Sequence, residues 1–114
     1  MNADCLFCKI TQRQIPADIV YEDELVIGFK DITPQAPVHL LIIPKNHIST
    51  INDVKPDDKN LIGHMVLCAQ QLAEENGLSE PGYRLVMNCN QHGGQTVFHI
   101  HLHLLGGQQL TVLA

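Results

Sequence analysis

Three histidines spaced two residues apart limit how this chain can fold more than any other feature of the sequence. They are His99, His101 and His103, within the segment FHIHLHLLGG that spans residues 98–107. Successive side chains of a β-strand point to opposite faces, so a strand here places the three imidazoles on one face and the aliphatic residues between them on the other. The pattern predicts a buried strand over residues 97–105 with one apolar face and one face of imidazoles.

The rest of the chain contains several short strand-like segments and one long helical segment. The strand-like segments, rich in aliphatic residues and bounded by turn residues, span residues 18–22, 25–30, 38–44 and 82–90. A helix is predicted from about Pro56 to Asn76, because proline suits a first helical position and Gly77 suits the position after the last turn. A shorter helix is expected over residues 5–12. The sequence therefore predicts an α+β fold in one domain over residues 1–114, with an antiparallel sheet of about five strands, one long helix and a short N-terminal helix.

Charge and hydropathy exclude several classes of partner and location. The formal net charge is −5 and the seven Lys and Arg residues are scattered, which argues against nucleic acid as a partner. No apolar run approaches the ~20 residues that a bilayer span needs, so no membrane contact is expected. The first residues turn polar too soon for a secretory signal peptide. We therefore expect a cytoplasmic protein whose cysteines form no disulfide framework.

The face of imidazoles has three explanations: a metal site, hydrogen-bonded packing, or chemistry. Strand positions two apart are separated by roughly 6.5–7 Å and positions four apart by roughly 13 Å, which disfavours a single metal ion shared by all three rings. Packing alone is an alternative, although three desolvated imidazoles without a task are costly. A neutral imidazole attacks phosphorus well when one nitrogen is bare and the other keeps its proton on an acceptor. His101, flanked on both sides, is the natural candidate for such a nucleophile.

Three segments resemble the histidine triad nucleotide-binding family. FHIHLHLLGG resembles the family signature, in which histidines alternate with apolar residues, and two longer segments resemble the Hint branch: KDITPQAPVHLLIIPKNHIS and GYRLVMNCNQHGGQTVFHIHLHLLGG. The likeness runs from about residue 5 to residue 109. The ending Leu-Leu-Gly-Gly at residues 104–107 is typical of Hint proteins, whereas the dinucleoside polyphosphate hydrolase branch usually carries Pro-Arg there.

The resemblance implies an enzyme that hydrolyses purine nucleoside 5′-phosphoramidates. Such enzymes release an amine and AMP or GMP through a covalent nucleotidyl-histidine intermediate, so the expected partner is a purine nucleotide substrate. By position, His101 is the nucleophile, His103 binds the α-phosphate, and His39 assists proton delivery to the leaving amine. An amine leaves poorly unless it is protonated, so this chemistry needs an acid.

The same resemblance assigns residues that bind the nucleotide. The phosphate-binding positions are Asn88, Gly94, Gln95, Thr96 and again His103. Glycines in this loop free the backbone to turn its N–H groups toward an anion. Asp31 matches the residue that holds the ribose hydroxyls, and the apolar slot for the base is matched by Phe7, Ile10, Phe29 and Ile32. On pattern alone, these four apolar residues would be assigned to the core.

The resemblance also suggests a structural zinc ion, which catalysis does not require. Cys5 and Cys8 form a C-x-x-C pair, and with His47 and His99 they offer two thiolates and two imidazoles, a complete tetrahedral set. Some family members with this cysteine pair carry such a zinc, whereas others lack the cysteines. The zinc would join the N-terminal segment to the histidine strand. The alternative is a pair of reduced thiols near a helix start.

Some alternatives stay open. The tail QQLTVLA is short and lacks the tryptophan that the family usually carries near its C-terminus, so the family's leaving-group preference does not transfer to this chain. Hint proteins are typically homodimers, and a homodimer is expected here, with the long helix and the strand around residues 83–89 in the contact. The alternatives to a phosphoramidase are a nucleotide-binding regulatory or scaffold protein with vestigial catalysis, and a dinucleoside polyphosphate hydrolase.

Overall fold

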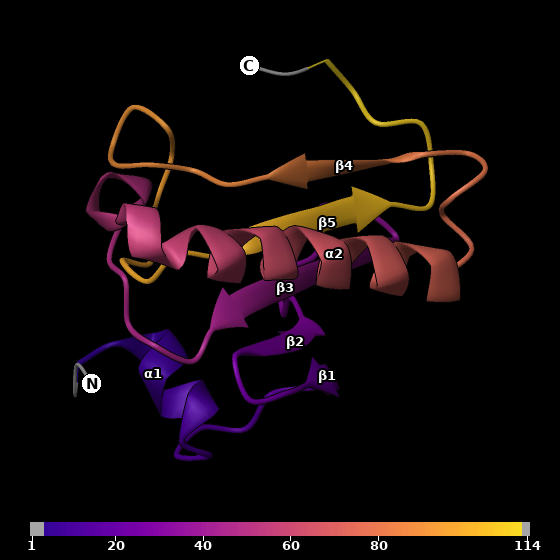
Figure 1. The fold of residues 1–114 in the computed structure, drawn as a ribbon. Helices are drawn as coiled ribbons and strands as arrows, with labels where there is room; N and C mark the ends of the chain where they lie inside the picture. The colour runs from indigo at the N-terminus through magenta and orange to yellow at the C-terminus, as the bar shows by residue number, and fades with distance from the viewer. Residues whose placement is uncertain (1–3, 113–114) are drawn as a thin grey trace.

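The computed structural model describes residues 4–112 and contains a five-stranded antiparallel sheet with one long helix across it (Figure 1). The strands are β1 (Ile19–Glu22), β2 (Val26–Lys30), β3 (Val38–Pro44), β4 (Tyr83–Val86) and β5 (Leu102–Gly106). The helices are α1 (Leu6–Thr11) and α2 (Lys59–Glu75), with short 3₁₀ turns at Ile51–Asp53 and Pro56–Asp58. The order of strands across the sheet is β1-β2-β3-β5-β4. The predicted fold class is confirmed.

Helix α2 covers one face of the sheet and forms the larger core with it. Its buried residues recur at helical spacing and include Met65, Ala69 and Leu72. They pack against residues of the central strands that point to this face, among them Ile42 and Leu104. As predicted, the aliphatic residues between the histidines belong to this core: Ile100, Leu102 and Leu104. One face of the histidine segment is therefore fixed by burial against α2.

The short helix α1 covers part of the opposite face. Phe7 and Ile10 of α1 pack with Phe29, Leu41 and Ile43, which point away from α2 on strands β2 and β3. The rings of Phe7 and Phe29 meet edge to face, with 5.6 Å between their centroids. The buried strand residues of this second, smaller core lie on β2 and β3. On the β5 side of the same face lie imidazoles.

The last strand begins five residues later than the sequence predicts, at Leu102 rather than at residue 97. In the β3–β5 ladder Ile42 pairs with Leu102, so a longer strand would bring His101 opposite Ile43 and then Ile100 opposite Pro44. Proline has no N–H to donate to a ladder, and β3 ends there. The N–H of Ile100 donates instead to the carbonyl of Ile48, at 2.8 Å. His99 and His101 therefore precede the strand instead of lying within it.

The other elements match the predicted ones with shifts at their ends. The predicted long helix starts with the 3₁₀ turn at Pro56–Asp58 and becomes α-helical only at Lys59. The fourth strand is shorter than the predicted span of residues 82–90 and ends at Val86. In the part of the chain that the structure describes, no helix is long and apolar enough to cross a membrane.

Removing a side chain between α2 and the sheet should test how far this core holds the fold. Leu72→Ala should lower the free energy of unfolding by about 2–5 kcal/mol, because the side chain is 2% exposed and its loss leaves a cavity. The same substitution at Leu67, which is 61% exposed on the same helix, should cost less than about 1 kcal/mol. Urea unfolding followed by circular dichroism measures both. Equal costs would show that α2 does not pack as described.

Candidate active site and metal centre

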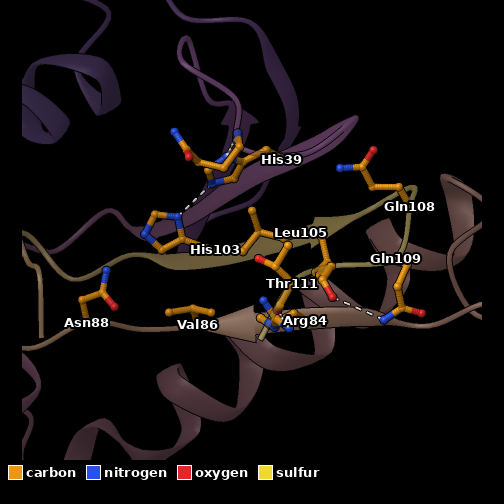
Figure 2. A pocket seen from close by; sticks show the side chains of 11 residues that line it. His39, Arg84, Val86, Asn88, His103, Leu105, Gln108, Gln109 and Thr111 are labelled. Carbon is orange, nitrogen blue, oxygen red and sulfur yellow. Dashed lines mark hydrogen bonds between the residues drawn. The ribbon is translucent and has the colours of Figure 1, made fainter. Parts of the chain in front are cut away.

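Two cavities lie on the face of the sheet opposite α2, and His103 lines both of them. The first has a volume of about 280 Å³, and its lining includes most of the predicted nucleotide-binding and catalytic residues: Phe7, Ile10, Phe29, Asp31, Ile32, Thr96, His101 and His103. The second, of about 360 Å³, is lined by His39, Asn88 and His103 together with residues that the sequence did not single out (Figure 2). We call them the apolar cavity and the polar cavity.

The ring of His101 is held by a backbone carbonyl. Its Nδ1 lies 2.8 Å from the carbonyl oxygen of His99, and a carbonyl can only accept, so Nδ1 carries the proton. In a neutral ring this leaves Nε2 with a bare lone pair. The ring of Phe7 packs edge-on against that of His101, with 5.0 Å between centroids. Local backbone and α1 together therefore fix both the tautomer and the position of this imidazole.

A line of hydrogen bonds fixes the tautomers of His39 and His103 as well. The backbone N–H of Gln35 donates to Nδ1 of His39 at 3.0 Å, so the proton of neutral His39 is on Nε2. That nitrogen lies 2.9 Å from Nδ1 of His103 and donates to it (Figure 2). The proton of neutral His103 must then be on Nε2.

His103 Nε2 has no hydrogen-bond partner in the protein. Within residues 4–112 it is the one buried side-chain nitrogen or oxygen in that condition. A buried donor without a partner costs roughly 1–3 kcal/mol, and a ligand that accepts a hydrogen bond from it would recover this cost. Because His103 lines both cavities, the unpaired N–H is available to an anion bound between them.

Burial keeps the three imidazoles neutral. It lowers the pKa of His101, although the hydrogen bond to the His99 carbonyl and the Asp31 carboxylate oppose this. Burial, and then the nearby rings of His101 and His39, lowers the pKa of His103 to about 4. Burial also lowers the pKa of His39, partly offset by Asp31. At neutral pH the site therefore presents imidazoles, not imidazolium ions.

Asp31 lies at the end of β2, where the chain turns toward His39. Its Oδ1 accepts from the backbone N–H of Thr33 at 2.8 Å and from the Thr33 hydroxyl at 3.2 Å. Its Oδ2 lies 3.5 Å from His39 Nε2. The carboxylate is therefore held by its own turn, at the rim of the apolar cavity, with one oxygen directed to the histidines.

The glycine loop before the histidine segment is held by its own hydrogen bonds. The side chain of Gln95 donates to the carbonyls of Ser49 and Val97, and its oxygen accepts from the N–H of Asn90. The backbone N–H groups of Gly94 and Gln95 donate to the carbonyls of Gln91 and Asn90. The sequence analysis expected N–H groups of this loop to be turned toward an anion. In the structure these two N–H groups donate within the loop instead. Of the loop positions predicted to bind phosphate, Thr96 is the one that lines the apolar cavity.

The polar cavity contains residues that the sequence analysis missed. Arg84 lies two positions before Val86, on the same face of β4, and both line the cavity (Figure 2). The C-terminal segment folds back over β4, where the Arg84 guanidinium donates to the carbonyl of Thr111 at 2.8 Å. Gln35 lines it too and sets the tautomer of His39 through its backbone. Alternation on the strand around residues 82–90 could have indicated Arg84, but no sequence pattern indicates the return of the tail.

The cysteine pair meets two histidines at the N-terminal end of α1. Nε2 of His99 donates to the carbonyl of Pro44 at 2.7 Å, which leaves the Nδ1 lone pair directed to the sulfurs of Cys5 and Cys8 at 3.3 and 3.5 Å. His47 Nδ1 lies 3.2 Å from the Cys8 sulfur. All four ligand atoms lie within 4.8 Å of one another. Tetrahedral zinc, with bonds of about 2.0 Å to nitrogen and about 2.3 Å to sulfur, separates its ligands by roughly 3.3–3.8 Å, so these residues fit the ion.

Similarity to known proteins agrees with this geometry. A family model described as "Scavenger mRNA decapping enzyme C-term binding" matches residues 4–112. The chain is 54% identical over 110 residues to a purine nucleoside phosphoramidase of Escherichia coli K12, covering 96% of this chain and 92% of the relative. It is 50% identical over 110 residues to an uncharacterised HIT-like protein of Synechococcus elongatus, covering 96% of each chain.

Solved structures show the same fold. A HIT family hydrolase from Legionella pneumophila superposes with a TM-score of 0.93 at 61% identity, covering 95% of this chain and 96% of that one. A zinc-bound histidine triad family protein from Mycobacterium smegmatis superposes with a TM-score of 0.81 at 36% identity, covering 92% and 76%. Two of its alternating histidines, His101 and His103, line the apolar cavity, and the chain belongs to the histidine triad (HIT) family.

Proposed function

We propose that this protein hydrolyses purine nucleoside 5′-phosphoramidates through a nucleotidyl intermediate on His101. The observation that carries the proposal is the pair of fixed tautomers at the cavity. His101 keeps its proton on a backbone carbonyl and has a bare Nε2, while His103 has a buried, unpaired Nε2–H. One ring offers a nucleophile and the other offers a donor to the anion it attacks. The name of the E. coli relative supports the same substrate class.

The apolar cavity suits a nucleoside monophosphate group with its base at the inner end. We place the base against Phe7, Ile10 and Phe29, with Ile32, which is 93% exposed, at the mouth. The carboxylate of Asp31 would accept hydrogen bonds from the ribose hydroxyls. The phosphate would then lie between the two cavities, where Thr96 lines one, Asn88 lines the other, and His103 lines both. Gly94 and Gln95 would act by shaping the loop that presents Thr96.

The reaction needs two displacements at phosphorus. In the first, the Nε2 lone pair of His101 forms a bond to the α-phosphorus as the bond from phosphorus to the amine nitrogen breaks. The amine takes up one proton as it leaves. Because burial keeps both rings neutral, solvent supplies that proton, and we assign its delivery to His39 acting through His103, the two being joined by the 2.9 Å hydrogen bond. In the second displacement, water attacks the phosphorus and gives one proton to solvent, while the bond from phosphorus to Nε2 breaks. Neutral His101 and the nucleoside monophosphate are released.

The environment of these groups supports that sequence of steps. The His103 Nε2–H can donate to a phosphoryl oxygen whose charge rises in the transition state, without reorganisation, because the donor is already in place. The His99 carbonyl stabilises positive charge on His101 once its ring is bonded to phosphorus. Asp31 lowers the cost of positive charge at all three rings. The protein therefore stabilises charge at the points where the reaction creates it.

We also propose that Cys5, Cys8, His47 and His99 hold a structural zinc ion. When bound there, zinc supplies a cross-link between α1 and the segment before β5, and no step of the reaction needs it. The donor set, the directed lone pair of His99 and the mutual distances support this. The zinc-bound relative from M. smegmatis shows that this family can carry the ion.

We also propose that the protein forms a homodimer and is located in the cytoplasm. Strand β4 is at the edge of the sheet, so one side of its backbone is free to pair with another strand. Exposed apolar side chains are present on α2 and on β4 itself: Val66, Leu67 and Tyr83. A second copy covering this edge and helix would bury them. The free thiols of the four cysteines suit a reducing compartment.

Replacing the nucleophile should separate binding from chemistry. His101→Ala should abolish release of amine from adenosine 5′-phosphoramidate, a loss of at least about 10³-fold, while AMP affinity changes little. Intact-mass analysis after rapid mixing with an AMP–amine substrate should show an acid-labile AMP adduct on the wild type and none on the variant. His92→Ala, at an exposed position outside both cavities, is the matched control. A wild type that binds AMP but turns over no purine phosphoramidate would contradict the enzyme and favour a binding role.

Removing zinc should weaken the fold before it weakens the chemistry. A chelator should lower Tm by roughly 10 °C or more, because a ligand present at 1,000 times its Kd contributes about 4 kcal/mol. Activity measured below the lower Tm should persist, because no catalytic group is a ligand. Cys5→Ser/Cys8→Ser should show the lower Tm without chelator. Loss of activity from protein that circular dichroism shows to be folded would contradict this division.

Neutral imidazoles should make stability fall in acid. The folded-state pKa of His103, about 4, is below the ordinary value of 6.5, so between these values the unfolded chain binds more protons than the folded one. Stability is therefore fully present above pH 6.5 and decreases as pH falls toward 4, by at most about 1.4 kcal/mol per pH unit for this group. Urea unfolding across this range should give a smaller slope for His103→Gln than for the wild type. Equal slopes would show that His103 is not held neutral.

A further inference from the structure

A second group of side chains with metal-ligand chemistry lies away from the cavities described above. It consists of Asp23, His64 and Cys68, and none of the three lines the apolar or the polar cavity. Asp23 is in the turn between β1 and β2, while His64 and Cys68 are four residues apart on α2. Positions four apart on a helix lie on one face, one turn above the other. The group therefore joins the long helix to the hairpin at the edge of the sheet.

The ligand atoms of this group are close enough to share one ion. His64 Nε2 lies 2.6 Å from Asp23 Oδ2 and 3.6 Å from the Cys68 sulfur, and all three ligand atoms lie within 4.8 Å of one another. Tetrahedral zinc separates nitrogen and sulfur ligands by roughly 3.5 Å, and nitrogen and oxygen ligands by roughly 3.3 Å. The distance between His64 Nε2 and Asp23 Oδ2 has to open by about 0.7 Å to reach this separation. Both side chains are about one-third exposed, at 33% and 27%, so they can move and an ion can reach them.

The surroundings of Asp23 resemble the outer shell of a metal site. Its Oδ1 accepts from the backbone N–H groups of Leu25 and Val26, at 2.8 and 2.9 Å. The hydroxyl of Tyr21 donates to Oδ2 at 2.7 Å. These bonds fix the carboxylate in place and leave a lone pair of Oδ2 for a further partner, which at present is His64. Outer hydrogen bonds of this kind orient ligands in known metal sites.

We propose that Asp23, His64 and Cys68 form a second Zn²⁺ site, independent of the one at Cys5 and Cys8. On binding, the Cys68 sulfur loses its proton to solvent and bonds to the ion. The Nε2 proton of His64, which now points to Asp23, is exchanged through solvent for one on Nδ1, so that Nε2 binds the ion, and Asp23 binds through Oδ2. Water would fill the fourth position, because the structure offers three ligands. A thiolate and an imidazole select Zn²⁺ over Mg²⁺. Burial raises the pKa of the Cys68 thiol, so the thiolate forms readily only when a cation compensates its charge.

A full-length protein without the first zinc site tests this directly. In Cys5→Ser/Cys8→Ser, titration with Zn²⁺ against a chromophoric chelator should show one bound equivalent, and Mg²⁺ should not compete. Adding His64→Gln or Cys68→Ala should weaken that binding by at least about tenfold. Adding Cys89→Ala, a thiol outside the group, should leave it unchanged. A Cys5→Ser/Cys8→Ser protein that binds no zinc, or binding that survives both substitutions, would overturn the proposal.

A second measurement covers the case in which the double variant does not fold. Native mass spectrometry of the wild type loaded with zinc should then show one more equivalent than the same spectrum of His64→Gln. His64→Gln changes a side chain that is one-third exposed and replaces it with a good helix former, so α2 should persist. Equal zinc content in the two folded proteins would overturn the proposal, whatever the outcome for the phosphoramidase activity.

Discussion

The hydrogen bond from His101 to the carbonyl of its neighbour His99 is the interaction on which the proposed chemistry depends. A carbonyl accepts and never donates, so the 2.8 Å contact assigns the proton of His101 to Nδ1 without help from any side chain. The bond requires the backbone before β5 to leave the ladder, which it does where Pro44 ends β3. Because Pro44 of β3 has no N–H to donate, the backbone before β5 can take the conformation in which His101 bonds to the His99 carbonyl. Nε2 of His101 is then left without a proton.

The same residue connects the candidate metal centre to the candidate active site. The ring of His99 is fully buried between the Pro44 carbonyl and the sulfurs of Cys5 and Cys8, and its backbone oxygen orients His101. The rings of His39 and His103 are ordered separately, by the N–H of Gln35. Two separate sets of hydrogen bonds thus hold the imidazoles. One fixes His99 and His101 and involves the N-terminal segment, and the other fixes His39 and His103 and involves the loop before β3.

Much of this arrangement could be predicted from the sequence, and its failures have physical causes. Alternation correctly placed Ile100, Leu102 and Leu104 in the core under α2, because burial of one face leaves little choice of register. It failed on where the strand begins, since that depends on Pro44, a residue distant in sequence. The phosphate loop was predicted as a set of free N–H groups, but the N–H groups of Gly94 and Gln95 donate within the loop, and the Gln95 amide bonds to Asn90 and Val97. The position of Arg84 under the C-terminal segment and the meeting of Asp23 with His64 arise only from tertiary packing.

Helix α1 is six residues long, yet both candidate sites depend on it. Phe7 contacts the rings of His99 and His101, with centroids 5.9 and 5.0 Å away, and it also walls the apolar cavity, while Cys8 on the same helix faces the metal ligands. Detachment of this one turn and a half would open the nucleoside slot to solvent and disperse the thiols in a single event. Ligand in the slot and metal at the thiols would each hold the helix down, so occupancy of one should slow amide hydrogen exchange around the other.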